Sequence, residues 1–550
     1  MIGVIARSSD HPVVKEFFEL FKTPWEFYRS GGQYDVVLCA ENGEVREATA
    51  QLVLIYGVHS CSHDAENGLS TNSHQGNNLL LYRGREIPIY GSCVVFQEER
   101  DSTLNDSASG YSAMSVRGSS RGAVVRIGYD LFGEVRGLLT TGQPPANAAS
   151  PTLELHIAVL RDLIIESGVP LVEIPPVPDG YRFIACLTHD VDHPSIRQHV
   201  LDHTTLGFLY RATLVSLWSL LHGRLQFAKA LKNWWAVLKL PFVYLGLAND
   251  FWLQFDRYTK LEDGAHSTFF VVPFPDCPGE GKRGPAPNYR ASRYGIQQIA
   301  DSVHRLMSEG CEIGLHGIDA WCDSSKGQRE LDEVRRVTGD REVGVRMHWL
   351  YADEQTPAML EKAGAVYDST VGYNETIGYR AGTTQAYRPF GVARLLELPL
   401  HVMDTALFFP SYLDLSAAEA RDRIAGIINN AAHYGGSFVV NWHDRSIAPE
   451  RLWDDTYVDL VGELKARNAW LATAGDAVGW FRKRRSVEFQ NVDLASGTAR
   501  IRIDTKSSDQ LPGLQVLLHH GKTTRQIPVD TVIEESRSTS NAATSCVVVS

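Results

Sequence analysis

Carboxylate and imidazole side chains gather in one short stretch, residues 183–194, which reads FIACLTHDVDHP. Asp190 and Asp192 are two positions apart, so both lean to the same side if the chain is extended there. Carboxylates this close repel each other unless a cation or a proton lies between them. The stretch therefore predicts a site for metal or acid–base chemistry, and the alternative is a simple turn after a strand.

Three further segments carry polar residues where an apolar run ends. His316 follows CEIGL, Arg346 and His348 lie in VGVRMHWL, and His443 follows SFVVNW. In parallel α/β folds, ligand-binding and catalytic groups collect just past the carboxyl ends of the strands. We therefore expect all these side chains to share one face with Asp190 and Asp192.

The chemistry that needs this set is metal-assisted hydrolysis. Carboxylate and imidazole ligands suit a borderline divalent ion such as zinc, which polarises a carbonyl and lowers the pKa of bound water. A second carboxylate would take a proton from the water, a cation would keep that carboxylate ionised, and an imidazole on the opposite side would protonate the leaving group. The residues that can fill these roles are Asp190, Asp192, His316, Arg346 and His443.

Alternating strands and helices must position these residues. The uncharged, mostly apolar run Phe183–Leu187 is typical of a strand covered on both faces, and Ser267–Phe274 is the next strand along the chain. Helix-like stretches at 294–308, 325–338 and 417–434 separate the later strands. This order predicts an α/β fold with a parallel sheet.

Five motifs in this part of the chain, from about Tyr181 to Ser446, resemble the polysaccharide deacetylase family, also called the NodB-homology domain. THDVD is similar to the first family motif (TFDD or FDVE/D), EIGLHGIDAW to EIGSHGxxH, and VRMHWL stands in the place of RxPxxS. KAGAVYDSTVGY is similar to LGYxYDSS, and NWHD to the last motif. The resemblance implies a distorted (β/α) barrel that removes acyl groups from sugars with a bound metal.

The same resemblance implies a role for each site residue. Asp190 would be the general base, Asp192 and His316 metal ligands, Arg346 the residue that positions the base, and His443 the acid. We also predict contacts with a carbohydrate substrate from three residues in or beside the motifs, Tyr373, Arg380 and Trp442.

Two positions depart from the family pattern and leave the third metal ligand open. The family's second metal histidine falls on Ala320, and the proline of its third motif falls on His348. His348 could supply the imidazole from the neighbouring strand, Asp319 could serve as an oxygen ligand, or the site could hold metal weakly. We favour His348, because RxH together with HDVD and GYRAGT is similar to a subgroup of the family with a longer N-terminal region.

A chain of 550 residues exceeds what one hydrophobic core usually organises, so we expect several domains. Residues 1–178 predict an α/β region, in which the Ser/Gly-rich segment 102–122 is expected to be a loop. The barrel would occupy residues 179–484. Short alternating strands predict a small antiparallel β-module over 485–533, and residues 534–550 are expected to be disordered.

An insertion at about residues 199–263 is rich in Leu, Trp, Phe and Tyr and carries scattered basic residues. Amphipathic helices that pack on a neighbouring element are one interpretation. The other is contact of residues 204–248 with a membrane surface, which would place the protein at the inner membrane as a peripheral protein.

The amino-acid composition argues against one class of binding partner and favours one cellular location. The formal net charge of −12 and the lack of a basic stripe argue against a nucleic-acid partner. Eight scattered cysteines without a CxxC pair, and no secretory signal, favour a cytoplasmic location. The oligomeric state is not predicted.

The sequence as a whole favours a metal-dependent hydrolase that removes an acyl group, expected to be acetyl, from an amino sugar or a polysaccharide precursor. One rival hypothesis is a barrel that has lost its metal and serves as a carbohydrate-binding or scaffolding module, for which Ala320 is the best support. Another rival keeps the metal and hydrolyses an amide that is not part of a sugar.

Overall fold

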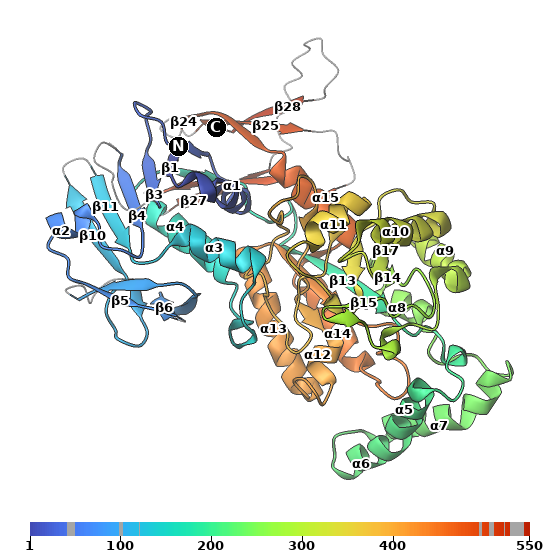
Figure 1. The fold of residues 1–550 in the computed structure, drawn as a ribbon. Coiled ribbons are helices and arrows are strands. Elements are labelled where there is room, and N and C mark those ends of the chain that lie inside the picture. The colour runs from blue at the N-terminus through green and yellow to red at the C-terminus, as the bar shows by residue number, and fades with distance from the viewer. Residues whose placement is uncertain are drawn as a thin grey trace.

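The computed structural model describes residues 1–40, 50–76, 78–97, 103–119, 122–493, 498–504, 511–521, 523–528 and 544–549. Figure 1 shows an N-terminal region in blue, a central body in green to orange, and a helical arm that projects from the central body. Separate hydrophobic clusters fill the N-terminal region and the central body. No helix among the described residues is long and apolar enough to cross a membrane.

The N-terminal region is built on a six-stranded sheet with the order β10-β11-β4-β3-β1-β2. All neighbours pair in parallel except β10 and β11. The strands are β1 (Ile2–Ile5), β2 (Trp25–Phe27), β3 (Val36–Cys39), β4 (Leu52–Tyr56), β10 (Met114–Ser119) and β11 (Gly122–Ile127). The helices are α1 (His11–Leu20), α2 (Ser62–Glu66), α3 (Leu131–Thr140) and α4 (Thr152–Glu166). This arrangement confirms the α/β class predicted for the region.

Short antiparallel strands complete the N-terminal region: β5 (Thr71–His74), β6 (Asn78–Tyr82), β7 (Arg85–Ile89), β8 (Cys93–Phe96) and β9 (Leu104–Asp106). The loop predicted for residues 102–122 is wrong where β9 and β10 lie. In β10, Val116 stands opposite Val125 of β11. Pairing with a partner strand decides the conformation there, and the local Ser/Gly composition does not report that partner.

The central body has one nine-stranded parallel sheet with the order β20-β19-β18-β17-β14-β13-β22-β21, in which β23 also pairs with β13. Its strands are β13 (Phe183–Val191), β14 (Thr268–Val271), β17 (Glu312–Gly317), β18 (Val345–Met347), β19 (Tyr367–Asp368), β20 (Leu396–Glu397), β21 (Val402–Met403), β22 (Ser437–Asn441) and β23 (Ala469–Leu471). Every residue of β13 is buried, as the apolar run in the sequence predicted. Asp190 lies within this strand, so the simple turn is excluded.

The two ends of this sheet lie close together. Strands β20 and β21 stand at opposite ends of the strand order, yet only residues 398–401 separate them in the chain. These residues also bridge the gap, because Leu398 donates to the carbonyl of Asp368 and His401 donates to that of Val439. The sheet therefore curls into an incomplete barrel.

Helices surround the barrel and follow its strands. They are α8 (Phe255–Glu262), α9 (Ala300–Ser308), α10 (Ser324–Thr338), α11 (Thr356–Ala363), α12 (Asp404–Phe408), α13 (Ala417–Tyr434), α14 (Asp454–Ala466) and α15 (Ala474–Arg485). A two-residue hairpin, β15 (Glu280–Gly281) with β16 (Gly284–Pro285), lies in the loop after β14.

Most of the insertion predicted at 199–263 forms the arm that projects at the lower right of Figure 1, whereas its last helix, α8, belongs to the helices around the barrel. It consists of α5 (His203–Tyr210), a π-helical turn (Arg211–Val215), α6 (Ser216–Leu221) and α7 (Phe227–Tyr244). Its inner side packs on Ala448, in the loop after β22, through a small cluster that includes Phe208 and Trp252.

The C-terminal part forms the expected antiparallel β-structure, divided between two sheets. Strand β12 (Leu171–Glu173) pairs with β26 (Gln515–His520), which pairs with β27 (Thr523–Pro528). The other sheet contains β24 (Glu488–Asp493), β25 (Thr498–Asp504) and β28 (Thr544–Val549). Disorder was predicted for 534–550, but residues 544–549 pair with β25, so the prediction is wrong for them. Residues 534–543 and 550 lie outside the described residues.

Candidate metal centre and active-site cleft

The carboxyl ends of four parallel strands bring the predicted residues to one edge of the barrel. Asp190 lies near the carboxyl end of β13, Asp192 directly follows that strand, and His316 lies in β17. Arg346 lies in β18 with His348 directly after it, and His443 follows β22. Because neighbouring strands pair in parallel, their carboxyl ends meet at the same edge.

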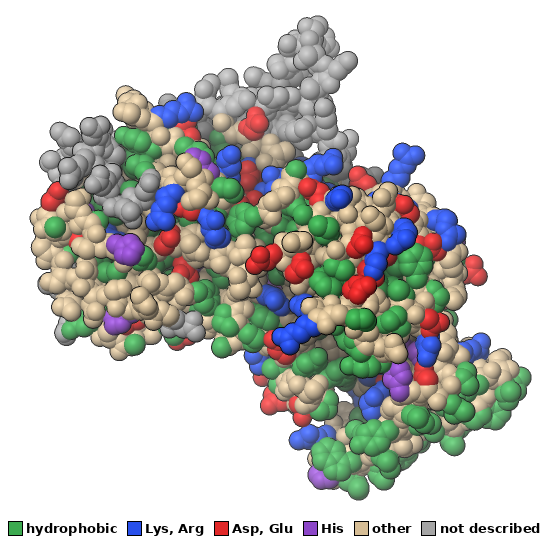
Figure 2. Space-filling model, in the orientation of Figure 1, with side chains coloured by type: hydrophobic (Ala, Val, Ile, Leu, Met, Phe, Trp, Pro, Cys, Tyr) green, Lys and Arg blue, Asp and Glu red, His purple; other side chains and the backbone are tan. Residues whose placement is uncertain are grey.

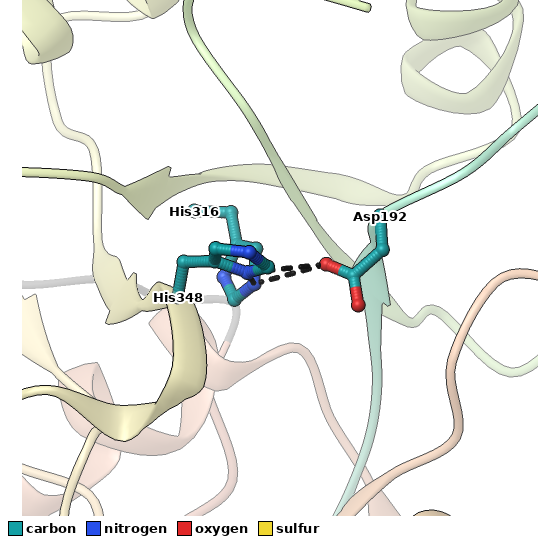
Figure 3. Close-up of side chains that lie close together, drawn as sticks. All are labelled: Asp192, His316 and His348. Atoms are coloured by element: carbon teal, nitrogen blue, oxygen red, sulfur yellow. Dashed lines mark hydrogen bonds and ion pairs between the residues drawn. The ribbon is translucent and has the colours of Figure 1, made fainter. Parts of the chain in front are cut away.

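Asp192, His316 and His348 point toward one another, as Figure 3 shows. One ligand atom from each lies within 4.8 Å of the other two. The Oδ1 atom of Asp192 is 3.4 Å from Nε2 of His316 and 3.3 Å from Nδ1 of His348. The two ring nitrogens are themselves 2.9 Å apart. These residues form a candidate Asp/His/His metal site.

Backbone carbonyls determine which ring nitrogen of His316 and of His348 faces the candidate metal position. Nδ1 of His316 lies 3.0 Å from the carbonyl oxygen of Arg346, and Nε2 of His348 lies 2.9 Å from that of Arg290. A carbonyl oxygen only accepts hydrogen bonds, so each of these nitrogens carries the proton. The lone pairs of His316 Nε2 and His348 Nδ1 are therefore directed at each other and at Asp192.

This donor set fits a bound cation. Two imidazole lone pairs and a carboxylate oxygen converge, and Oδ1 of Asp192 finds no hydrogen-bond donor within the described part of the chain. A divalent ion would satisfy all three acceptors at once, and histidine ligands of metals commonly donate their other ring N–H to a carbonyl. Two nitrogens and one oxygen suit zinc among the common ions.

Asp319 and Ala320, the other positions considered for the third ligand, make different contacts. Asp319 accepts from the backbone N of Glu280 at 2.6 Å and pairs with the ammonium of Lys326 at 2.9 Å. Ala320 is fully buried and packs close to Gly327 of helix α10. Among the described alternatives, His348 is the residue that the fold brings to His316 and Asp192.

Asp190 is held by two donors on the wall beside this site. Its Oδ1 accepts from the Arg346 guanidinium at 3.1 Å, and its Oδ2 accepts from the Asn441 amide at 2.7 Å. The Arg346 side chain is fully buried and lies over the ring of Phe270. Two hydrogen bonds of this kind fix the direction in which the carboxylate points.

His443 has a carboxylate partner that the sequence analysis did not identify, Asp404. Nδ1 of His443 lies 2.6 Å from Oδ1 of Asp404, and the backbone N of His443 donates to the other oxygen at 2.7 Å. Burial opposes the charge on His443, but Asp404, with Asp192 and Asp190 nearby, outweighs it and raises the pKa of His443 to about 9. The imidazole is therefore protonated at neutral pH and can donate a proton from Nε2.

The ligand residues also influence one another's pKa. Burial alone would raise the pKa of Asp192, but His348, His316 and His443 hold it well below its usual value. Burial lowers the pKa of His348, and the attraction of Asp192 opposes this only in part. Both directions favour a charged carboxylate beside a neutral imidazole, the forms in which these groups bind a metal.

Comparison with known proteins gives matches in structure. No family model matches the sequence, and no match was found to any curated protein. A provisionally assigned polysaccharide deacetylase from Mycobacterium smegmatis is 19% identical, with a TM-score of 0.36 over 56% of this chain and 95% of its own. Puue allantoinase is 13% identical, with a TM-score of 0.32 over 55% of this chain and 91% of its own. The Xyl-CE4 domain of a xylanase from the hindgut metagenome of Trinervitermes trinervoides is 11% identical, with a TM-score of 0.24 over 54% of this chain and 89% of its own.

The resemblance of this chain to the polysaccharide deacetylases rests on the motifs in its sequence. Its curled parallel sheet is a distorted (β/α) barrel, as those motifs implied. The subgroup with an HDVD motif and a long N-terminal region stays a prediction.

An open cleft of about 370 Å³ in this barrel contains the candidate metal site. Asp190, Asp192 and His443 line it, and aromatic side chains border it, among them Trp349 and Tyr412. Trp349 follows His348 in a turn where its φ is 62°, a conformation that bulky residues rarely adopt. The turn brings both His348 and Trp349 to the cleft, and the sequence carries no signal for it.

The three residues predicted to contact substrate are not among those that line the cleft. Trp442 is fully buried against Phe408 and Tyr457. The Tyr373 hydroxyl donates to the carbonyl of Gln143 in the N-terminal region, and the Arg380 guanidinium donates to the carbonyl of Gly372. Their contacts tie elements of the fold together, and a substrate role for them stays a prediction.

Proposed function

We propose that this protein is a metal-dependent hydrolase that removes an acyl group, most simply acetyl, from an amino sugar or a polysaccharide precursor. The observation that carries the proposal is the convergence of Asp192, His316 and His348 in one cleft, with Asp190 and His443 beside them. Zinc as the ion, a carbohydrate as the substrate and a cytoplasmic location belong to the same proposal.

In this proposal Asp190 serves as the base and His443 as the acid. Asp190, held by Arg346 and Asn441, would accept a proton from the attacking water. His443, held by Asp404, would give a proton to the leaving amine or alcohol. A divalent ion held by Asp192, His316 and His348 would polarise the acyl carbonyl.

Metal content tests the proposal against a metal-free binding or scaffolding module. We expect purified protein to retain close to one equivalent of a divalent metal. Less than about a tenth of an equivalent of zinc, cobalt, nickel or iron after gentle purification would favour the metal-free module. An acetate-release screen across acetylated sugars and non-sugar amides would then separate the sugar deacylase from a hydrolase of other amides.

Variants separate the ligands from the base. His316→Ala and His348→Ala should both lose metal and turnover, whereas Asp190→Asn should lose turnover and keep the metal. Asp319→Ala is the matched control for the third ligand, because its carboxylate pairs with Lys326. Loss of metal in Asp319→Ala with full metal content in His348→Ala would reverse our assignment.

A further inference from the structure

The arm presents an apolar stripe to solvent along helix α7. Phe227, Leu231, Trp235, Leu238 and Phe242 are 53–64% exposed. At about 100° per residue, these five positions fall within an arc of about 80° on one side of the helix. The opposite side of the helix, which includes Ala236, Leu240 and Val243, is buried. The stripe is therefore one continuous face and not a scatter of single exposed residues.

The first half of the arm has a similar outer face. Large apolar residues of α5, the π-helical turn and α6 are 45–75% exposed. They are Leu206, Tyr210, Leu214, Leu217, Trp218 and Leu221. Figure 2 shows hydrophobic side chains spread over the arm at the lower right of the molecule. So much exposed apolar surface indicates a binding surface.

Charge on the arm differs sharply from charge on the rest of the chain. The whole protein has 65 Asp and Glu against 53 Lys and Arg, yet residues 203–249 contain five basic residues and no Asp or Glu. Arg211, Arg224 and Lys229 pair with acidic residues outside the arm. Lys232 and Lys239 are exposed on α7, to one side of the apolar stripe.

Aromatic and basic residues also lie together on the arm. The guanidinium of Arg224 is 5.4 Å from the ring centre of Trp218, and the ammonium of Lys239 is 5.5 Å from that of Trp235. An amphipathic helix with Trp, Phe and Leu on one side and Lys or Arg beside them is typical of helices that lie in the headgroup region of a bilayer. Anionic headgroups would complement the local positive charge.

We propose that this outer face of the arm, residues 203–249, docks on the surface of an anionic lipid bilayer. A second copy of the chain fits less well, because a two-fold contact between arms would bring their uncompensated positive charges together. The proposal does not depend on the chemistry assigned to the cleft.

Docking would also place the cleft close to the bilayer. The inner side of the arm is bonded to the loop after β22, which contributes Arg445 and Arg451 to the cleft. Arg211 pairs with Glu450 at 2.9 Å, Lys229 donates to the carbonyl of Leu452 at 2.7 Å, and the backbone N of Glu450 donates to Asn233 at 2.7 Å. These bonds fix the arm against one wall of the cleft, so a substrate presented at the membrane would lie near the site.

Cosedimentation of the full chain with lipid vesicles tests the proposal. We expect binding to vesicles of phosphatidylcholine with phosphatidylglycerol, weaker binding to phosphatidylcholine alone, and release by high salt. Lys232→Gln/Lys239→Gln should bind the anionic vesicles about thirtyfold more weakly, because each lysine contributes a factor of about five. The charge-matched control is Lys282→Gln/Arg283→Gln, on an exposed loop of the barrel, which should bind like wild type.

A second variant removes the apolar stripe, with Leu231, Trp235 and Phe242 all changed to Ser. These side chains are exposed, so the variant should fold, and circular dichroism with an unchanged midpoint of thermal unfolding would verify that. It should lose vesicle binding, whereas Val116→Ser/Val458→Ser, with exposed apolar residues outside the arm, should not.

No binding of wild type to anionic vesicles would overturn the proposal. The proposal would also be overturned if wild type formed a dimer in light scattering but bound no vesicles, and if the variant no longer formed that dimer. Hydrolytic activity on soluble substrates should survive in the variant, so the docking and the proposed reaction can fail separately.

Discussion

The pair formed by Arg346 and Asp190 allows a quantitative test of how the base is held. Replacing Arg346 with Met keeps much of the buried volume but removes the cation. The Asp190 carboxylate would then remain buried with Asn441 as its side-chain donor, and the carbonyl of Ser369 would lose its bond from the guanidinium. Breaking a buried ion pair by removing one partner costs about 3–5 kcal/mol. We expect Arg346→Met to lower the free energy of unfolding by that amount at neutral pH.

A double-mutant cycle is completed by also removing the charge of Asp190, which Arg346 balances. In Asp190→Asn/Arg346→Met no charged carboxylate is left unpaired at position 190, so the double variant should recover about 2–3 kcal/mol relative to the sum of the single losses. Urea unfolding followed by fluorescence measures all four free energies. Arg336→Met is the control, because this arginine is 61% exposed and its ion pair with Glu333 should contribute less than about 1 kcal/mol. Additive losses in the double variant would refute the idea that Arg346 stabilises the Asp190 charge.

Two further predictions concern other buried carboxylates. Asp404→Asn should lower turnover by about 10²–10⁴-fold with metal content unchanged, because His443 loses the partner that keeps it protonated; full turnover in this variant would contradict the role of Asp404. Burial raises the pKa of Glu154 to about 7, from about 4.5 in the unfolded chain, so the folded state binds the extra proton and loses about 3 kcal/mol of stability as pH rises from about 4.5 to 7. Unfolding titrations of wild type and Glu154→Gln across this range should show that loss in wild type and not in the variant. A difference between the two proteins that does not change with pH would reject the assignment.

The strands that position the site could be predicted because their sequences carry two signals at once. An apolar run shows burial on both faces, and a polar group at its end shows where the strand meets solvent. Phe183–Leu187 followed by Asp190 carries both, and SFVVNW before His443 does as well. The same rule would have found Asp404, since LPLHVMD is an apolar run that ends in an acid. That strand, β21, is only two residues long in the structure, so its signal is weak.

Other parts of the site depend on contacts that no local pattern reports. His348 was one of three alternatives in the sequence, and its place beside His316 depends on the pairing of β17 with β18 and on the positive φ of Trp349. Bulky residues rarely adopt that conformation, so propensity argues against the turn that the fold imposes. The Tyr373 hydroxyl likewise contacts Gln143, 230 positions earlier in the chain, which no motif indicates.

The response of Asp192→Asn to zinc distinguishes a metal site from a metal-free module. His348, His316 and His443 hold the pKa of Asp192 well below its usual value, so its charge already contributes stability to the metal-free protein at neutral pH. After chelation, Asp192→Asn should therefore be less stable than wild type at neutral pH. With zinc at about a hundred times its Kd, wild type should gain about 2.7 kcal/mol, and the variant, which loses the charged ligand, should gain far less.

The difference in stability between the two proteins should thus widen as zinc is added, and thermal unfolding with and without the metal measures this. A metal-free module predicts a constant difference, because zinc would then change neither protein. A third ligand other than His348 predicts a widening for Asp192→Asn but an undiminished zinc response in His348→Ala. We do not expect that last outcome. His316 Nε2 and His348 Nδ1 lie 2.9 Å apart, and a backbone carbonyl fixes the other nitrogen of each ring.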